Sequence, residues 1–216
     1  ADPNVPTYEL ATSIEDGETY VIAALSDTDY YALTTTTFTS GSYSYLEGEE
    51  VTVSNDKVTS TVSDDMLWIF TADGNGYNVM NGSNYLTRKS SGSPGVYLTT
   101  DDEGSAYNEW MYVYGSSGSQ LRLLGGSGGS TYFYLYLTSS SGTYYFANTS
   151  STAYSTLYLF KYTEATNVSV SSVAVTDIDT PVAGATPDTA AATSTTGVTV
   201  SAVSWSPNVT TFGYGT

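Results

Sequence analysis

Alternation with a period of two residues is the feature of this sequence that most limits its fold. Aromatic and β-branched residues alternate with other residues in several short runs, at 51–53, 112–114, 132–136 and 198–200. Clusters of Gly, Ser, Asn and Asp separate such runs, at 73–76, 90–95, 115–119 and 125–130. Successive side chains of a strand point to opposite faces, whereas helical periodicity is hard to find anywhere in the chain. The pattern predicts an all-β fold, a sandwich or a barrel of many short strands.

The residue types that are missing exclude most catalytic chemistry. The chain has no Cys and no His, so disulfides, thiol nucleophiles, Cys/His zinc sites and Ser-His-Asp triads are impossible. Its net charge of -17 repels nucleic acid, whose recognition needs clustered Lys and Arg. No apolar run approaches the roughly 20 residues of a membrane span. We therefore expect a binding module and not an enzyme, with no cofactor, no nucleic-acid partner and no membrane insertion.

A weak threefold repeat runs through residues 18–162. Each copy opens with a short strand, and these lie at 19–22, 77–80 and 121–124. A Tyr-Leu or Tyr-x-Leu pair follows in each copy. Each copy then closes on an aromatic-rich strand, and these lie at 67–70, 109–112 and 157–160. Three such four-strand units predict a closed barrel capped by hairpins, since closure removes the edges that a Tyr-rich sheet would otherwise expose.

The three closing strands share a further pattern. They contain Met66-Leu67-Trp68, Asn108-Glu109-Trp110 and Thr156-Leu157-Tyr158. Here the chain resembles the β-trefoil, and more loosely the ricin-type lectin modules within it, whose signature is a Gln-x-Trp in each closing strand. The resemblance covers about two-thirds of the chain, and it keeps the Trp twice and the Gln nowhere. It implies a β-trefoil with Trp68, Trp110 and Tyr158 at equivalent positions and both Trp side chains in the core.

The composition changes near residue 164. Residues 167–216 contain no Lys or Arg and are dominated by Val, Ala, Thr and Ser. The runs 173–184, 203–207 and 212–216 resemble the opening strands of bacterial Ig-like modules, which repeat in tandem in surface proteins of Gram-positive gut bacteria. We therefore expect a β-trefoil-like binding domain at 1–164 and a partial Ig-like β-sandwich at 165–216, with Trp205 in its core.

A complete sandwich of this type needs roughly 80–100 residues, more than the tail contains. The sequence is therefore expected to be part of a longer protein with further Ig-like repeats downstream. The Ser, Thr and Tyr content and the near absence of Lys predict a secreted protein on the bacterial cell surface.

Acidic residues gather at several predicted turns. The clusters are Asp27/Asp29, Glu47/Glu49/Glu50, Asp64/Asp65 and Asp101/Asp102/Glu103. Carboxylates of this kind can bind Ca²⁺, but none of the clusters has the spacing of an EF-hand loop. Glycoside hydrolysis needs two carboxylates within roughly 5–10 Å, and the sequence alone brings no two of them together. We interpret the clusters as solvated loop charges and expect no metal site.

The 21 tyrosines are the strongest anomaly of the composition. A Tyr ring offers a large rigid face and a hydroxyl group, which suits both sugar stacking and protein recognition. Two loops of small residues, 125–130 and 139–142, lead into paired tyrosines of the third repeat. The candidate ligand-binding residues are therefore Tyr132, Tyr134, Tyr144 and Tyr145.

The expected partner is a host glycan or a host protein. An acidic chain does not attract acidic partners, and only Arg88, Lys89 and Arg122 could reverse its field locally, so we expect a neutral sugar or a protein face. A glycan-binding adhesin is the first hypothesis. Capture of host immunoglobulin in a superantigen-like manner, an accessory role beside a secreted hydrolase and a structural spacer remain as alternatives.

Overall fold

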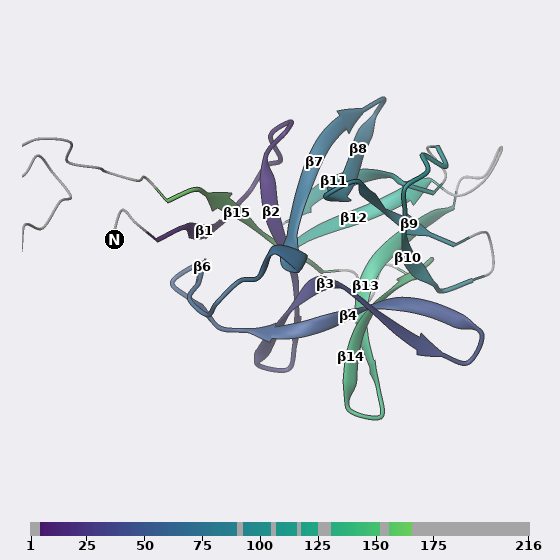
Figure 1. The fold of residues 1–216 in the computed structure, drawn as a ribbon, viewed down its shortest axis with the longest axis horizontal. Coiled ribbons are helices and arrows are strands. Elements are labelled where there is room, and N and C mark those ends of the chain that lie inside the picture. Colours follow the sequence, from purple (N-terminus) through teal and green to yellow (C-terminus); the bar gives the residue numbers. More distant parts are fainter. Residues whose placement is uncertain are drawn as a thin grey trace, which may run out of the picture. The chain divides into compact units, whose positions relative to one another are not determined.

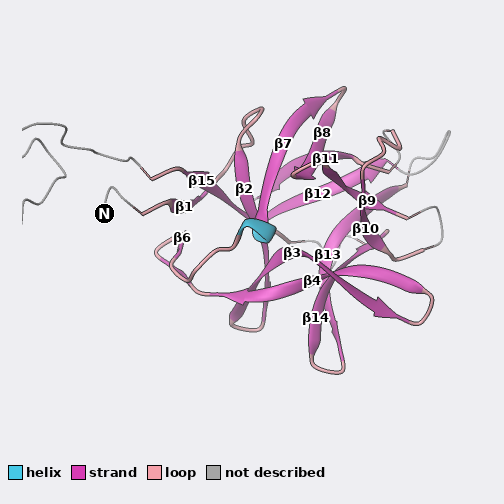
Figure 2. Cartoon of the chain, viewed as in Figure 1, coloured by secondary structure: helices cyan, strands magenta, loops and turns pink. Residues whose placement is uncertain are grey.

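The computed structural model describes residues 5–89, 93–104, 107–115, 118–124, 131–151 and 156–165. The regular secondary structure of the described chain is strand throughout, apart from one short 3-10 helix, η1, at Asp64–Met66 (Figures 1 and 2). The strands are β1 Thr7–Leu10, β2 Thr19–Ser26, β3 Asp29–Ser40, β4 Tyr43–Val51, β5 Val53–Ser54, β6 Lys57–Val58, β7 Leu67–Asp73, β8 Gly76–Asn81, β9 Asn84–Arg88, β10 Val96–Thr99, β11 Glu109–Gly115, β12 Gly118–Leu124, β13 Tyr132–Ser140, β14 Thr143–Thr149 and β15 Tyr158–Thr163. The all-β class predicted from the alternation is confirmed.

Six strands close into a barrel. Strand β2 pairs with β15 and β7, β7 pairs with β8, β8 with β11, and β11 with β12, all of them antiparallel. The barrel is closed between β12 and β15 by Ser119 and Leu157, whose backbones form two hydrogen bonds of 3.0 and 2.7 Å with each other. Each barrel strand thus has a partner on both sides, which protects the barrel from pairing with another chain.

A hairpin is inserted into each third of the barrel. The hairpins are β3–β4, β9–β10 and β13–β14 (Figure 1). Repeat 1 therefore runs from β2 to β7, repeat 2 from β8 to β11, and repeat 3 from β12 to β15. Three four-strand units around a six-stranded barrel define the β-trefoil, so the fold that the sequence resemblance implies is confirmed.

The Trp residues of the first two closing strands occupy equivalent places in the core. Both side chains are fully buried among apolar side chains from all three repeats. The indole Nε1–H of Trp68 donates to the carbonyl of Leu33 at 3.0 Å, and that of Trp110 donates to the carbonyl of Leu86 at 2.7 Å. Each acceptor lies on the hairpin of the same repeat. Because buried polar groups need partners, these bonds fix each hairpin on its part of the barrel.

The third repeat departs from the predicted register. In repeats 1 and 2, the Trp of the closing strand pairs with a Tyr of the opening strand. The matching pair in repeat 3 is Ser119 and Leu157, and Leu157 is buried in the same core. The prediction that Tyr158 takes the Trp position is therefore wrong by one residue. Such a shift exchanges the faces of a strand, and Tyr158 instead packs edge-on against Tyr30 with ring centroids 5.2 Å apart.

A second, smaller core lies on the outside of the first and last barrel strands. The connection from β4 to β7 carries β5, β6 and η1, and β6 also pairs with β1. Val58 and Met66 of this connection pack with Val21, Ala23 and Phe160 of the barrel strands. The insertion in repeat 1 therefore buries an apolar barrel face that would otherwise meet solvent.

The described compact unit runs from Thr7 to Thr163. Two sequence predictions fall outside the described residues. One is the partial Ig-like β-sandwich at 165–216 with Trp205, of which only Ala165 is described, and the other is the loop 125–130 before Tyr132.

Candidate ligand-binding face

The hairpins of repeats 1 and 3 form one four-stranded sheet. Strand β14 pairs with β4 through Tyr145 and Glu47, which gives the strand order β13–β14–β4–β3. The β13–β14 turn consists of Ser141 and Gly142, with φ values of 52° and 85°. Positive φ at both central residues is what a type I′ turn requires, and Gly142 adopts it without strain. The two hairpins project from the barrel in the lower part of Figure 1.

The sheet carries a group of aromatic side chains on its outer face. Cross-strand partners in an antiparallel sheet share a face, and the register places Phe38 opposite Tyr45. The ring of Tyr145 lies against both, with centroids 4.7 Å from Phe38 and 4.6 Å from Tyr45. Tyr136 shares this face because it lies two residues from Thr138, which pairs with Tyr145. Tyr43 shares it because it lies two residues from Tyr45. We call Phe38, Tyr43, Tyr45, Tyr136 and Tyr145 the hairpin face.

The hairpin face has a buried layer and an open layer. Tyr45 is only 6% exposed, Phe38, Tyr136 and Tyr145 are half-buried, and Tyr43 is exposed. Burial, with the neighbouring phenols of Tyr145, Tyr136 and Tyr43, raises the pKa of Tyr45. Rings that are supported from beneath lose little conformational freedom when a ligand covers them. The face therefore offers rigid apolar area edged with hydroxyl groups.

The inner side of this sheet is bonded to repeat 2. Asn148 of β14 is 3% exposed, and its Nδ2 donates to the carbonyls of Ser93 at 3.1 Å and Gly95 at 2.7 Å. Its backbone N–H donates to the carbonyl of Pro94 at 2.9 Å. Buried hydrogen bonds of this kind are costly to break. The sheet below the hairpin face is thus fixed to the rest of the trefoil.

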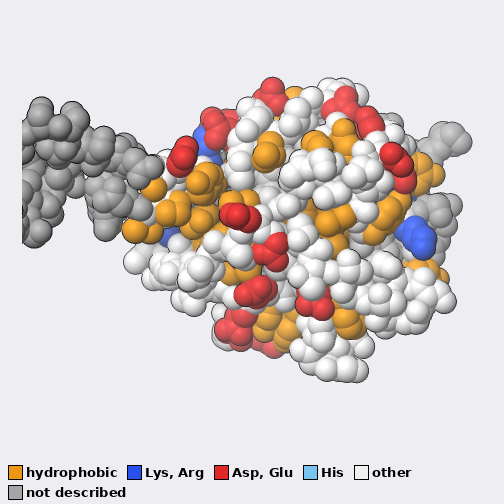
Figure 3. Space-filling model, in the orientation of Figure 1, with side chains coloured by type: hydrophobic (Ala, Val, Ile, Leu, Met, Phe, Trp, Pro, Cys, Tyr) orange, Lys and Arg blue, Asp and Glu red, His pale blue; other side chains and the backbone are white. Residues whose placement is uncertain are grey.

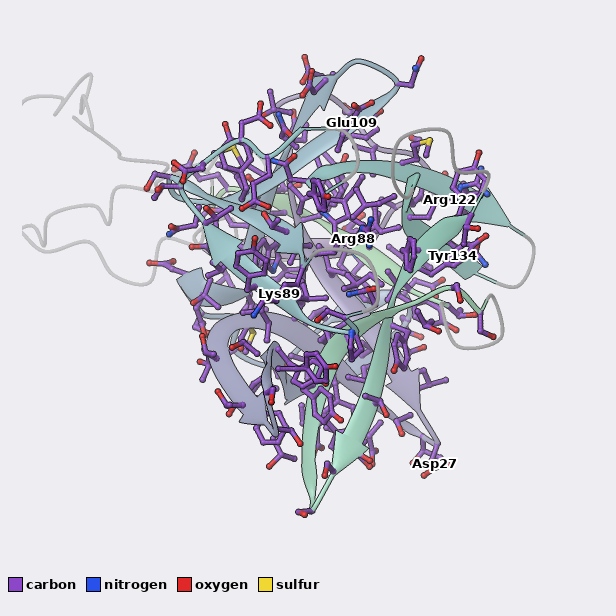
Figure 4. The ribbon with its side chains drawn as sticks, turned by 90° about the vertical axis from the view of Figure 1, so that its right-hand side faces the viewer. Asp27, Arg88, Lys89, Glu109, Arg122 and Tyr134 are labelled. Atoms are coloured by element: carbon purple, nitrogen blue, oxygen red, sulfur yellow. The ribbon has the colours of Figure 1, made fainter. Side chains whose placement is uncertain are left out.

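Charged side chains border the hairpin face on two sides. Glu47 shares the face because it pairs with Tyr145. Beyond β13, Arg122 of β12 pairs with Tyr134, and its guanidinium lies over the ring of Tyr132 at 4.0 Å from the centroid. Figure 4 shows Arg122 and Tyr134 close together. The hairpin face therefore lies between a carboxylate and a guanidinium.

Tyr144 lies on the opposite face of β14. Its ring stacks on Tyr31, with centroids 3.9 Å apart and an interplanar angle of 20°. A Cβ added at Gly48 would lie 3.1 Å from Cδ1 of Leu137 and 3.3 Å from the Cβ of Tyr31, so these neighbours would have to shift by a few tenths of an ångström. Burial and a hydrogen bond with Tyr144 raise the pKa of Tyr31 to about 12, and the charges of Glu50 and Asp29 act in the same direction.

We expect the protein to lose stability as the pH rises from about 10 to about 12. The folded state keeps the Tyr31 proton up to about 12, whereas an unfolded Tyr ionises near pH ~10. The unfolded chain therefore releases this proton first, and the free energy of unfolding falls across that window and not below it. Urea unfolding at pH about 8, 10 and 11.5 should show a steeper loss for the wild type than for Tyr31→Phe, which keeps the ring without its phenol. Identical slopes for the two proteins would contradict this assignment.

The four tyrosines predicted to bind ligand lie in different environments. Tyr145 lies at the centre of the hairpin face, and Tyr134 is 6% exposed at its border. Tyr132 is covered by Arg122, and Tyr144 faces away. The structure therefore does not gather all four into one site.

The other members of the hairpin face were not among the sequence candidates. The structure brings Tyr145 together with Phe38 and Tyr45 of repeat 1 and with Tyr136 of its own repeat. The signal that could have found them is the two-residue turn. If Gly41 and Ser42 form the turn, the residues on either side of it pair in order, and Phe38 comes to lie opposite Tyr45.

The basic residues expected to reverse the negative field do not all reach the surface. Arg88 is 1% exposed, and its guanidinium lies over the rings of Phe133 at 4.1 Å and Tyr107 at 5.3 Å from their centroids. Burial lowers the pKa of Arg88. Arg88 is therefore not available at the surface to reverse the negative field locally, because it packs between repeats 2 and 3. Lys89 is exposed, and Arg122 is partly covered.

The surface that the structure describes is acidic. Asp and Glu side chains are spread over the visible face in Figure 3, where Lys and Arg are few. Among the described residues, no three carboxylates gather closely enough to hold a metal ion. No helix in the same residues is long and apolar enough to cross a membrane.

A solved structure similar to this chain is that of a Polyporus squamosus lectin bound to the human-type influenza-binding epitope Neu5Aca2-6Galb1-4GlcNAc. The two chains are 13% identical, with a TM-score of 0.45, and the match covers 68% of this chain and 50% of the lectin chain. This chain thus spans about half the length of that lectin. No protein-family model and no curated protein matches the sequence. The fold assignment rests on the strand pairings described above.

Proposed function

We propose that this β-trefoil is a non-catalytic module that binds a neutral host glycan through the hairpin face. The observation that carries the proposal is the stack of Tyr145 on Phe38 and Tyr45, built by hairpins from two different repeats. A sugar ring presents C–H groups on its faces and hydroxyl groups at its edge. A half-buried aromatic layer edged with phenol hydroxyls is complementary to both.

Charge supports a neutral ligand over an acidic one. The chain carries a net charge of -17, and the carboxylate of Glu47 shares the hairpin face. A sialylated or sulfated glycan would be repelled by both. The Glu47 carboxylate can instead accept hydrogen bonds from the hydroxyl groups of a neutral sugar, and bonds to a charged acceptor are the stronger kind.

The setting of the module is a secreted bacterial surface protein, an adhesin. The support for this part of the proposal is the resemblance of residues 173–184, 203–207 and 212–216 to Ig-like modules that repeat in tandem in such proteins. In that arrangement the trefoil presents the binding surface, and Ig-like repeats form the stalk behind it.

Capture of a host protein such as immunoglobulin is the second candidate. The hairpin face favours it because rigid Tyr rings with Ser and Thr beside them resemble the composition of antibody loops. Accordingly, the same residues would carry either function, and only the identity of the partner separates the two.

A glycan array that also carries immobilised host immunoglobulins tests the proposal with the full chain. We expect binding to neutral glycans, with little signal from sialylated or sulfated ones. Signal from immunoglobulin alone would replace the first candidate with the second. Binding confined to acidic glycans would contradict the charge argument, and no binding to any printed partner would contradict both candidates.

A further inference from the structure

The aromatic residues of the hairpin face lie in a row that crosses the strands. Tyr136 of β13 pairs with Ala147 of β14, and Phe38 of β3 pairs with Tyr45 of β4. Ala147 is small and 1% exposed, and the phenols of Tyr136 and Tyr45 interact electrostatically with each other. Tyr145 lies two residues before Ala147 on β14, and its ring contacts those of Phe38 and Tyr45. Four neighbouring strands thus contribute to one row.

The row is longer than one sugar. Neighbouring strands lie ~4.8 Å apart, so three spacings from β13 to β3 give a row of roughly 14 Å. A single sugar ring stacks on one aromatic side chain and would leave the rest of the row in water. Three rings along this length, those of Tyr136, Tyr145 and Phe38, are half-buried.

We infer that the hairpin face binds an extended neutral oligosaccharide, which lies across the strands and contacts Tyr136, Tyr145 and Phe38 along its length. This inference rests on the proposed function and specifies its ligand. Glu47 lies beside Tyr145, so the central sugar is the one whose hydroxyl groups meet a carboxylate. The outer sugars meet Tyr136 on one side and Phe38 on the other.

The rings are held before the ligand arrives, so each further sugar adds contact at little cost in ordering the protein. Aromatic contacts contribute about 0.5–1.5 kcal/mol each, which is roughly a two- to tenfold gain in affinity per added stack. Affinity should therefore rise with chain length until all three rings are covered, and then stay constant.

Isothermal titration calorimetry with N-acetyllactosamine repeats, which are linear neutral glycans, tests the inference on the full chain. The tetrasaccharide should bind more tightly than the disaccharide, and the hexasaccharide should bind about as tightly as the tetrasaccharide. Phe38→Ala and Tyr136→Ala, at the two ends of the row, should each remove much of that gain and change disaccharide binding less. Tyr114→Ala is the matched control, because Tyr114 is 57% exposed on β11, outside the hairpin face.

The possible outcomes separate the inference from the function on which it rests. Equal affinity for all three lengths, unchanged in Phe38→Ala and Tyr136→Ala, would overturn the extended ligand and leave a neutral-glycan module. Absence of binding at every length, from a chain with the circular dichroism of a folded β protein, would overturn the neutral-glycan function and the inference together. A length dependence that both end variants keep would place the oligosaccharide on another surface and overturn the inference.

Discussion

Trp110→Ala should lower the free energy of unfolding by about 3–5 kcal/mol. The side chain is fully buried in the core shared by the three repeats, so its removal leaves a cavity. It also removes the hydrogen-bond donor of the Leu86 carbonyl, 2.7 Å away. Small domains have total stabilities of only about 5–15 kcal/mol, so the loss should be plain in a urea unfolding curve followed by circular dichroism.

Two variants separate the contributions at this site. Trp110→Phe fills most of the space and leaves the Leu86 carbonyl without its donor, so we expect a smaller loss of about 1–3 kcal/mol. Tyr114→Ala, four residues along the same strand, removes a side chain that is 57% exposed and should change the stability by less than about 0.5 kcal/mol. Equal losses in Trp110→Ala and Tyr114→Ala would mean that Trp110 is not part of the core.

Tyr145→Ala should weaken oligosaccharide binding by about 30-fold or more, which corresponds to ~2 kcal/mol. Tyr145 is the central ring of the hairpin face and stacks on both Phe38 and Tyr45. Its removal takes away a ligand contact and also frees the neighbouring rings. Calorimetry with the N-acetyllactosamine hexasaccharide measures the effect.

The neighbouring residue provides the control for Tyr145→Ala. Tyr144→Ala removes the stack on Tyr31 on the other face of β14, so it should reduce stability while the folded protein keeps its affinity. If Tyr145→Ala binds like the wild type while Tyr144→Ala loses binding, the ligand lies on the face of β14 that carries Tyr144, which would contradict the proposal.

The sequence was sufficient to predict the trefoil because its signals are local. The threefold repeat of short strands predicted the closed barrel, and the resemblance of the closing strands at Trp68 and Trp110 to those of ricin-type lectin modules implied the trefoil. The burial of Trp68 and Trp110 also followed from their matched places in two closing strands. Each of these inferences needs only neighbours in sequence or a repeated pattern.

The hairpin face could not be predicted in the same way. It depends on the pairing of β14 with β4, which lie about a hundred residues apart and share no turn. Alternation alone could have separated Tyr144 from Tyr145, but the pattern does not tell which of them faces the core. The same ambiguity produced the error at Leu157 and Tyr158, where two apolar neighbours compete for one core position.

Backbone and aromatic NMR of the full chain, titrated with the N-acetyllactosamine hexasaccharide, tests most directly whether the hairpin face is the glycan site. We expect the largest chemical-shift changes on Phe38, Tyr136 and Tyr145 and on the strands that carry them, while the second core around Phe160 stays unchanged. Changes confined to other strands, or none at saturating oligosaccharide, would contradict this expectation.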